Sequence, residues 1–277
     1  MPPEGKVSTS SGSDFGVVAG SQVDGSAELN YLIYAPAHYG KPATTRLPLM
    51  IFLHGQGEGG TDPWKVRLQG PPKLVYPPSE FGQRFKDDSN SSASASAFLR
   101  DNFIVISPQC PPFTHWSAVP VQKKLTAFVQ HILDSTLLVD PSRVYLTGLS
   151  AGGFGTFSQA STNPQFFAAI SPICGGGKPG MGRSLAQAKM PIWAFHGVND
   201  AVVSVENTDR SMDEYRKAWS GAPANAVKYN RIDIAPDRDP NWPVSWNYQG
   251  HASWVNAYEG IEGGRALFEW FLSFKKD

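Results

Sequence analysis

The chain has 277 residues, of which 41% are hydrophobic and 17% charged, and its 24 basic and 24 acidic side chains cancel. This length and composition suit one α/β domain with a sizeable core. The zero net charge argues against a basic field for nucleic acid or anionic lipid, and no apolar stretch approaches the ~20 residues that span a bilayer. We therefore expect neither a nucleic-acid nor a membrane partner.

We expect residues 1–26 to be a flexible segment and residues 27–277 to form a single domain. Residues 1–14 contain no apolar central region, so they do not have the pattern of a signal peptide. The protein is then either cytoplasmic or secreted with a leader that is absent from this sequence. The compartment stays open.

Apolar runs alternate with helical patterns along the domain. The clearest helix is predicted over residues 121–136, and a last helix is predicted over residues 265–275. The expected strands are residues 28–34, 48–53, 103–107, 143–148, 167–171, 191–196 and 227–234. Because strands and helices alternate, we predict an α/β fold whose mostly parallel central sheet has helices on both faces.

Two stretches interrupt this alternation. Residues 76–101 contain the low-complexity run Ser-Asn-Ser-Ser-Ala-Ser-Ala-Ser-Ala, which predicts a mobile surface insertion. Residues 235–250 form a loop that is rich in proline and aromatic residues and precedes His251. We expect aromatic rings to wall the substrate, and the candidates are Trp116, Trp242, Trp246 and Trp254. For any one of these rings, simple packing of the loops is an equally good interpretation.

The strand at residues 143–148 leads into Gly148-Leu149-Ser150-Ala151-Gly152, which matches G-x-S-x-G. A strand, this turn and a following helix form the nucleophile elbow of α/β-hydrolases. The turn is so tight that a side chain at Gly148 or Gly152 would collide with neighbouring backbone. It places the Ser150 hydroxyl at the top of the sheet, where it can act as a nucleophile. An ordinary glycine-rich turn is the competing interpretation.

In this fold the acid follows the nucleophile in the chain. Asp200 comes just after the strand at residues 191–196, and the carboxyl ends of strands border the cleft of an open α/β sheet. We predict that Asp200 accepts a hydrogen bond from the base and fixes its tautomer. Capping of the next helix is the alternative role for Asp200, and Glu206 and Asp233 are the fallback acids.

Six histidines compete for the role of base, and His251 alone follows Asp200 in the chain. Its neighbours Gly250 and Ala252 suit a loop that swings an imidazole over Ser150, although a surface histidine is the alternative. We interpret His54, directly after a strand, as part of the turn of the oxyanion loop, and His196, in the corresponding turn before Asp200, as structural. The other three are expected in a turn, on a helix surface and in a loop that could line the cleft: His38, His131 and His115.

Acyl transfer also needs donors for the negative charge that develops on the carbonyl oxygen. We assign this oxyanion hole to the backbone N–H groups of Ala151 and Gln56, with Gly57 as the alternative to Gln56. Gln56 lies in the glycine-rich loop 54–60, where glycine lets the backbone approach the substrate. This loop has neither glycine pattern of a nucleotide site, so it does not predict nucleotide binding.

The two cysteines, Cys110 and Cys174, each follow an apolar strand. In the usual strand order two other strands separate these, which places the strand ends roughly 14 Å apart and beyond disulfide reach. We therefore expect two free thiols. Neither cysteine neighbours other metal ligands, so we predict no metal site, and the expected chemistry needs no cofactor.

Together these blocks resemble the esterase branch of the α/β-hydrolases, which includes feruloyl and acetylxylan esterases, polyhydroxybutyrate depolymerases and related predicted peptidases. The similar blocks are residues 53–60, 70–74, 107–111, 140–153 and 172–177. The resemblance implies the α/β-hydrolase fold and a triad of Ser150, Asp200 and His251. The insertion at residues 76–101 and the loop before His251 depart from the family pattern, so the family's substrate preferences carry over poorly.

The predicted function is therefore that of a serine carboxylesterase that forms an acyl-enzyme. The expected partners are small or polymeric esters: feruloyl and acetyl esters, polyesters or small aryl esters. The sequence leaves the oligomeric state open. Two alternatives stay open, namely a serine peptidase of the same fold and a catalytically inactive polysaccharide-binding module.

Overall fold

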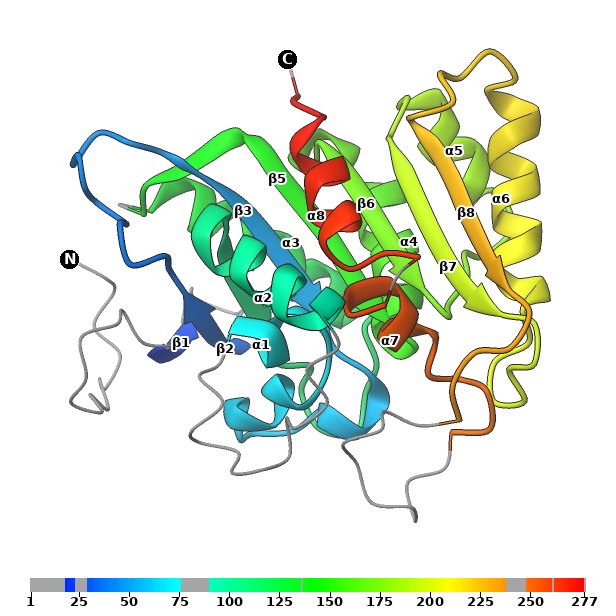
Figure 1. The fold of residues 1–277 in the computed structure, drawn as a ribbon, viewed down its shortest axis with the longest axis horizontal. Coiled ribbons are helices and arrows are strands. Elements are labelled where there is room, and N and C mark those ends of the chain that lie inside the picture. The colour runs from blue at the N-terminus through cyan, green and yellow to red at the C-terminus, as the bar shows by residue number, and fades with distance from the viewer. Residues whose placement is uncertain are drawn as a thin grey trace.

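The computed structural model describes residues 18–22, 29–75, 90–135, 137–237, 248–260 and 262–276. Within these ranges one eight-stranded sheet runs through the molecule in the order β1-β2-β4-β3-β5-β6-β7-β8 (Figure 1). Its strands are β1 Val18–Gln22, β2 Leu29–Tyr34, β3 Leu47–Leu53, β4 Ile104–Pro108, β5 Val139–Leu149, β6 Ala169–Ile173, β7 Ile192–Gly197 and β8 Val227–Ile232. The pairs β1–β2 and β2–β4 are antiparallel, and all the others are parallel.

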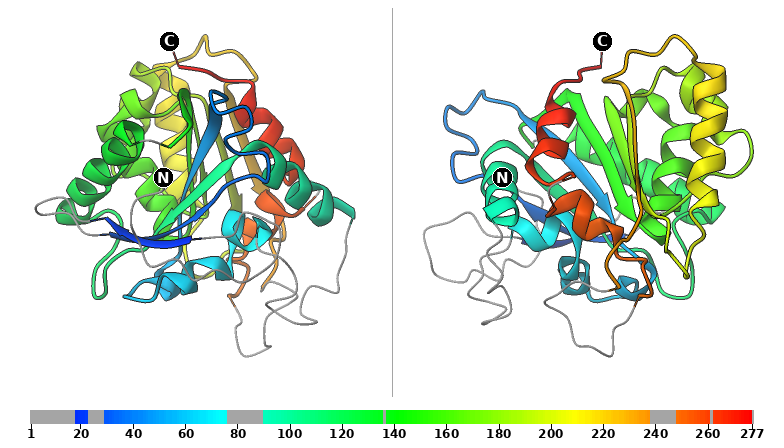
Figure 2. Two further views of the ribbon diagram at one scale, coloured as in Figure 1. Left: turned by 90° about the vertical axis from the view of Figure 1, so that its left-hand side faces the viewer. Right: turned by 45° about the vertical axis from the view of Figure 1, so that its right-hand side comes forward.

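Helices cover both faces of this sheet, as its edge-on view shows (Figure 2, left). One face carries α3 Val119–Asp134, α4 Ala151–Thr162, α5 Met181–Gln187 and α6 Glu206–Ala218. The other carries α1 Gly70–Val75, α2 Asn90–Asn102, α7 Ser253–Tyr258 and α8 Arg265–Leu272. In the part of the chain that the structure describes, short 3₁₀ helices in the connections are η1 Gln56–Glu58, η2 Pro63–Leu68 and η5 Pro164–Phe166. The predicted α/β fold, with a mostly parallel sheet between two helical layers, is confirmed.

The central strands read as continuous apolar runs because both of their faces are buried. In β3, Leu49 and Ile51 belong to the core under α3 and α4, whereas Met50 and Phe52 belong to the core on the opposite face. The same alternation makes two separate hydrophobic cores, one on each side of the sheet. Because β3 to β8 run parallel, the loops after β3, β5, β6 and β7 gather at one edge.

The structure differs from two local expectations. Residues 90–101 lie in α2, which packs on α1 and α8 and is not a mobile insertion; Ala95 and Leu99 are fully buried. Alanine favours the helix, and the small side chains allow close packing, with the Ser96 hydroxyl donating to Leu74 O at 2.6 Å. Residues 18–22, expected within a flexible segment, pair with β2 as strand β1. The remaining residues of the expected insertion, 76–89, lie outside the described residues.

The strand order separates the two cysteines. Cys110 follows β4 and Cys174 follows β6, with β3 and β5 between those strands. Both thiols are free and buried, which confirms the expectation from strand spacing.

None of the helices in the described ranges has both the length and the apolar character needed to cross a membrane.

The packing of α2 can be tested with Leu99→Ala, because Leu99 is fully buried. We expect the variant to lose about 2–5 kcal/mol of unfolding free energy in urea titrations, the usual range for a buried leucine. Ala97→Ser on the exposed side of α2 is the matched control and should change it by less than about 0.5 kcal/mol. Equal, small effects of both substitutions would contradict the docking of this helix.

Candidate active site

The turn between β5 and α4 has the strained geometry that the sequence predicts for a nucleophile elbow. Ser150 has φ 53° and ψ −118°, a conformation that is costly for a residue with a side chain. A Cβ on Gly148 would lie 2.5 Å from Gly152 O, and one on Gly152 would collide with Leu53 O. Both glycines are therefore required by close backbone contact, as expected.

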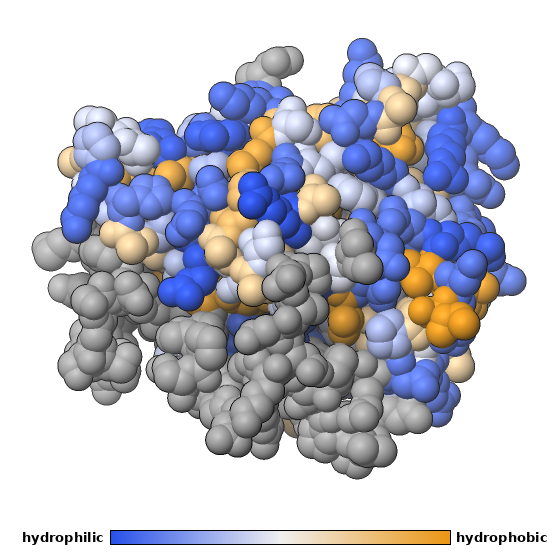
Figure 3. All heavy atoms as spheres, in the orientation of Figure 1, coloured by the Kyte–Doolittle hydropathy of each residue, from blue (hydrophilic) through white to orange (hydrophobic). Residues whose placement is uncertain are grey.

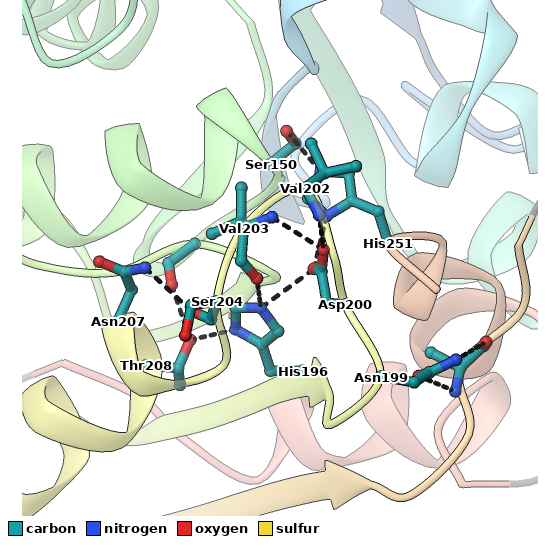
Figure 4. Close-up of polar contacts among 12 residues, drawn as sticks. Ser150, His196, Asn199, Asp200, Val202, Val203, Ser204, Asn207, Thr208 and His251 are labelled. Carbon is teal, nitrogen blue, oxygen red and sulfur yellow. Dashed lines mark hydrogen bonds and ion pairs between the residues drawn. The ribbon is translucent and has the colours of Figure 1, made fainter. Parts of the chain in front are cut away.

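Ser150, His251 and Asp200 form a hydrogen-bonded chain (Figure 4). The distance between His251 Nε2 and Ser150 Oγ is 2.8 Å, and that between His251 Nδ1 and Asp200 Oδ2 is 2.6 Å. An ionised carboxylate can only accept, so Nδ1 carries the proton and Nε2 is free to accept the Ser150 hydroxyl. The three side chains come from loops after β5, after β7 and before α7, and the tertiary fold alone brings them together.

Asp200 is buried and accepts four hydrogen bonds. Its Oδ1 accepts from the backbone N–H groups of Val202 and Val203 at 2.9 and 2.8 Å, and its Oδ2 accepts from His251 and from His196. Burial raises the pKa of Asp200, but the hydrogen bonds from His196, His251 and Val203 lower it by more. The carboxyl is therefore ionised at neutral pH. The backbone groups that Asp200 binds belong to its own loop, and α6 begins only at Glu206. The alternative role of Asp200 as the cap of that helix therefore does not apply.

The loop that carries His251 packs directly against the Asp200 loop. Ala201 N–H donates to Gln249 O at 3.0 Å, and a Cβ on Gly250, which has φ 77°, would lie 2.6 Å from Asn199 Nδ2. The side chain of Asn199 in turn pairs with the backbone of Ala235 at 2.8 and 3.0 Å. These contacts hold the acid and the imidazole in one rigid unit.

Competing effects set the pKa of His251. Burial lowers it, but the Cys174 sulfur beside the ring and the Asp200 carboxylate raise it by more, so it lies above its ordinary value. Cys174 follows β6, between the strands that end at Ser150 and Asp200. Sequence reasoning treated this cysteine as a free thiol and missed its contact with the imidazole; its position after β6 was the available signal.

The loop after β3 lies beside the nucleophile, since a Cβ on Gly55 would be 3.9 Å from Ser150 Cβ. Within the described part of the chain, the backbone N–H groups of Ala151 and Gln56 donate to no protein acceptor. Ala151 begins α4 and Gln56 begins η1, so both groups belong to the unpaired donors of helix starts. They are available to a substrate oxygen.

His54 and Trp116 brace this loop. Cys110 N–H donates to His54 Nε2 at 2.9 Å, so the ring proton is on Nδ1, which donates to Gly55 O at 2.5 Å. Trp116 Nε1 donates to His54 O at 2.9 Å and its ring packs edge-on against the imidazole. Burial lowers the pKa of His54 to about 4, so the ring is neutral. The expected place of His54 in the turn after β3 agrees with these contacts.

Trp116 and Trp254, which we expected to wall the substrate, are buried in the structure. Trp116 is only 1% exposed and Trp254 only 2%, so both rings contact protein. Trp254 packs edge-on against His251, and its Nε1 donates to Gln69 Oε1 at 2.9 Å. Both indoles therefore support the loops of the candidate site and present almost no surface to a ligand. Trp242 and Trp246 lie outside the described residues.

The other candidates do not join Ser150. His38 and His115 are exposed, and His131 is half-buried on α3. The fallback acids Glu206 and Asp233 are exposed. Among the described residues, no group of three or more His, Cys, Asp and Glu side chains could hold a metal ion.

Glu58 is a buried carboxyl that sequence reasoning passed over. Its Oε2 accepts from Gly55 N–H at 2.9 Å, and its Oε1 has no partner among the described residues. Burial raises its pKa well above the ordinary value, with the Gly55 hydrogen bond opposing that shift only partly. Burial therefore favours the neutral form of this side chain, which lies beside the loop after β3.

Glu58→Gln should stabilise the protein at pH 8 and not at pH 4. The folded-state pKa is raised, so the stability contributed by neutral Glu58 is complete below the unfolded pKa and is lost as the pH rises towards the folded one. The glutamine amide keeps an acceptor for Gly55 N–H and does not titrate, so the variant does not lose this stability as the pH rises. Urea unfolding at both pH values measures the difference, and Glu58→Ala, which lacks the acceptor, should destabilise at both. A gain from Glu58→Gln that is equal at pH 4 and pH 8 would contradict the neutral carboxyl.

Comparisons with known proteins agree with this architecture. No protein-family model matches the chain. It is 30% identical over 129 residues to poly(3-hydroxyalkanoate) depolymerase C of Paucimonas lemoignei, covering 36% of this chain and 28% of that protein. It is 33% identical over 121 residues to a bifunctional acetylxylan esterase/xylanase of Neocallimastix patriciarum, covering 42% of this chain and 17% of that protein.

Among solved structures, a thermostable esterase superposes with a TM-score of 0.66 at 27% identity, over 94% of this chain and 63% of the esterase. The chain thus spans less than a third of the length of the two curated relatives and under two thirds of the solved esterase. The chain therefore has the α/β-hydrolase fold and is similar in sequence and structure to esterases of that fold.

Proposed function

We propose that the protein is a serine carboxylesterase with Ser150 as nucleophile, His251 as base and Asp200 as the orienting acid. The observation that carries this proposal is the hydrogen-bonded chain from Ser150 Oγ to Asp200, with lengths of 2.8 and 2.6 Å, at a strained nucleophile elbow. A nucleophile bonded to a base that a third group orients is the arrangement that activates a serine hydroxyl.

In acylation, Ser150 Oγ attacks the ester carbonyl while its proton passes to His251 Nε2. Asp200 stabilises the imidazolium that forms and stays ionised. His251 then donates its proton to the departing alkoxide, which leaves as the alcohol. In deacylation the same nitrogen takes a proton from water, the hydroxide attacks the acyl-enzyme, and Ser150 leaves with the proton returned. No cofactor takes part in either step.

The unpaired N–H groups of Ala151 and Gln56 are suited to hold the oxyanion. Ala151 follows Ser150 at the start of α4, and Gln56 follows Gly55, where an added Cβ would lie 3.9 Å from Ser150 Cβ. Their positions are fixed by the helix start and by the His54–Gly55 contacts, so they need no reorganisation when charge develops on the carbonyl oxygen.

The substrate class that we propose is an ester with an apolar or aromatic part: feruloyl, acetyl-type, polyester or small aryl esters. Similarity to a polyhydroxyalkanoate depolymerase and an acetylxylan esterase supports this range. Val198, Val202 and Ile234 are exposed in the loops after β7 and β8, next to the Asp200 loop. Hydrophobic residues are visible on that side of the surface, at the lower right of Figure 3. Apolar surface beside the acid loop suits an apolar group of the substrate.

Ser150→Ala should reduce kcat/KM for p-nitrophenyl esters by about 10⁴-fold or more, because triad members act as one unit. The assay uses acetate to octanoate, and the chain-length profile measures the acyl pocket. Ser161→Ala, on the same helix α4, is the matched control and should retain activity. Turnover by Ser150→Ala near the wild-type rate would refute the mechanism, and preference for a matched anilide over its ester would favour a peptidase.

The pH dependence of kcat/KM should have its acidic midpoint above pH 6.5. The base works as neutral imidazole, and its neighbours raise the pKa of His251 above its ordinary value, so activity increases as the pH rises through that shifted pKa. Rates measured from pH 5 to pH 10 at low substrate concentration test this. A midpoint below 6.5 would show that burial outweighs the Asp200 and Cys174 contacts.

A further inference from the structure

A second histidine binds the same oxygen of Asp200 as His251 does. His196 lies in β7, is fully buried, and places its Nε2 3.1 Å from Asp200 Oδ2 (Figure 4). The carboxylate thus sits between two imidazole rings, and only one of them contacts Ser150. The serine mechanism described above assigns no role to His196.

Nε2 of His196 must carry a proton. Besides the Asp200 oxygen, it faces Val203 O at 2.9 Å. A carbonyl and an ionised carboxylate are both acceptors only, so an unprotonated Nε2 would face two acceptors with no hydrogen between them. In a fully buried site that repulsion has no water to relieve it.

Nδ1 of His196 faces Thr208, at the start of α6. The Thr208 hydroxyl lies 2.7 Å from Nδ1 and also donates to Gly175 O at 2.7 Å. A hydroxyl has a single proton, and Gly175 O can only accept, so the proton of Thr208 is committed to Gly175. Thr208 Oγ1 therefore accepts from Nδ1, which must also be protonated.

We propose that His196 is a doubly protonated, positively charged positioning residue that pairs with Asp200 and thereby tunes the basicity of His251. This inference rests on the proposed function and adds a residue that acts through Asp200. With His196 charged, the acid and its second partner form a neutral pair, and the carboxylate attracts the His251 proton less strongly. Without that charge, Asp200 would hold the proton on His251 more tightly.

Within the described residues, Asp200 is the one carboxylate that pairs with either ring. His251 also faces the Cys174 thiol after β6, the Ser150 hydroxyl after β5 and the Trp254 ring of α7. From α6, Thr208 hydrogen-bonds His196, whereas Glu206 is exposed and Asp209 is bound by Tyr229 and Arg231. The charge of His196 is therefore the single electrostatic difference that a neutral replacement makes at this site.

His196→Gln is the informative variant, because a glutamine amide can still donate to Asp200 while it carries no charge. We expect the acidic midpoint of its kcat/KM profile to move to higher pH by about one unit, the size of effect that a nearby charge has on a pKa. Thr208→Val removes the acceptor of the Nδ1 proton at constant shape and should move the midpoint in the same direction. A midpoint that stays in place or moves to lower pH in both variants would overturn the proposal.

Ser211→Ala is the control for general loosening of α6. Ser211 accepts from Gly177 N–H at 2.8 Å and donates to Asn207 O at 2.9 Å, without a contact to His196 or Asp200 among the described residues. Its acidic midpoint should equal that of the wild type. A shift as large as that of His196→Gln would show that the effect is merely structural and would overturn the proposal.

The protonation state can be measured without turnover, by ¹⁵N NMR of the imidazole rings in the wild-type protein. The signals of His196, identified by their absence in His196→Gln, or by their displacement in Thr208→Val if the former does not fold, should show protons on both nitrogens under the conditions of the activity assay. One unprotonated nitrogen under those conditions would overturn the proposal. Absence of ester hydrolysis would instead refute the proposed function, and the NMR result would stand independently of it.

Discussion

The close approach of Gly152 to the carbonyl of Leu53 is the constraint on which the site depends. It joins the end of β3 to the start of α4 and leaves no room for a side chain between them. The chain between Gly148 and Gly152 must therefore turn sharply, and Ser150 takes the strained conformation that projects its hydroxyl from the sheet edge. The same contact places the loop that follows Leu53 beside Ser150. One backbone contact thus sets both the nucleophile and the N–H groups that we propose for the oxyanion.

Polar groups of two kinds lie on different sides of Ser150: an ionised carboxylate on one side, and buried side chains whose neutral forms are favoured on the other. On the β7 side, Asp200 is ionised and fully hydrogen-bonded by two backbone N–H groups and two imidazoles. On the β3 side, His54 and Glu58 are buried. Burial lowers the pKa of His54 and raises that of Glu58, and both shifts favour the neutral form. A neutral oxyanion loop carries no charge that would oppose a negative oxygen. A charged acid beside the base stabilises the imidazolium, so each side matches the charge that the proposed reaction develops there.

Polar contacts with distant parts of the chain support the loops that carry these groups. Trp116 holds the loop after β3 through His54 O, and Gln69 holds Trp254 next to His251. The aromatic side chains expected to meet a substrate are used here to support the site. Such support explains how the triad keeps its hydrogen-bond distances although its members are 51 and 101 positions apart in the chain.

The sequence by itself determined the fold class and the identity of the triad candidates. These depend on local patterns: apolar runs of strand and helix length, a G-x-S-x-G turn after a strand, and the chain order of Asp200 and His251. Only the tertiary structure decided that the Ser/Ala run is a docked helix, that Trp116 and Trp254 are buried, and that Cys174 and His196 adjoin the triad. The reason is physical: burial and hydrogen-bond partners come from packing between distant segments, and a local pattern of residue types carries no information about which distant side chain fills the space beside it.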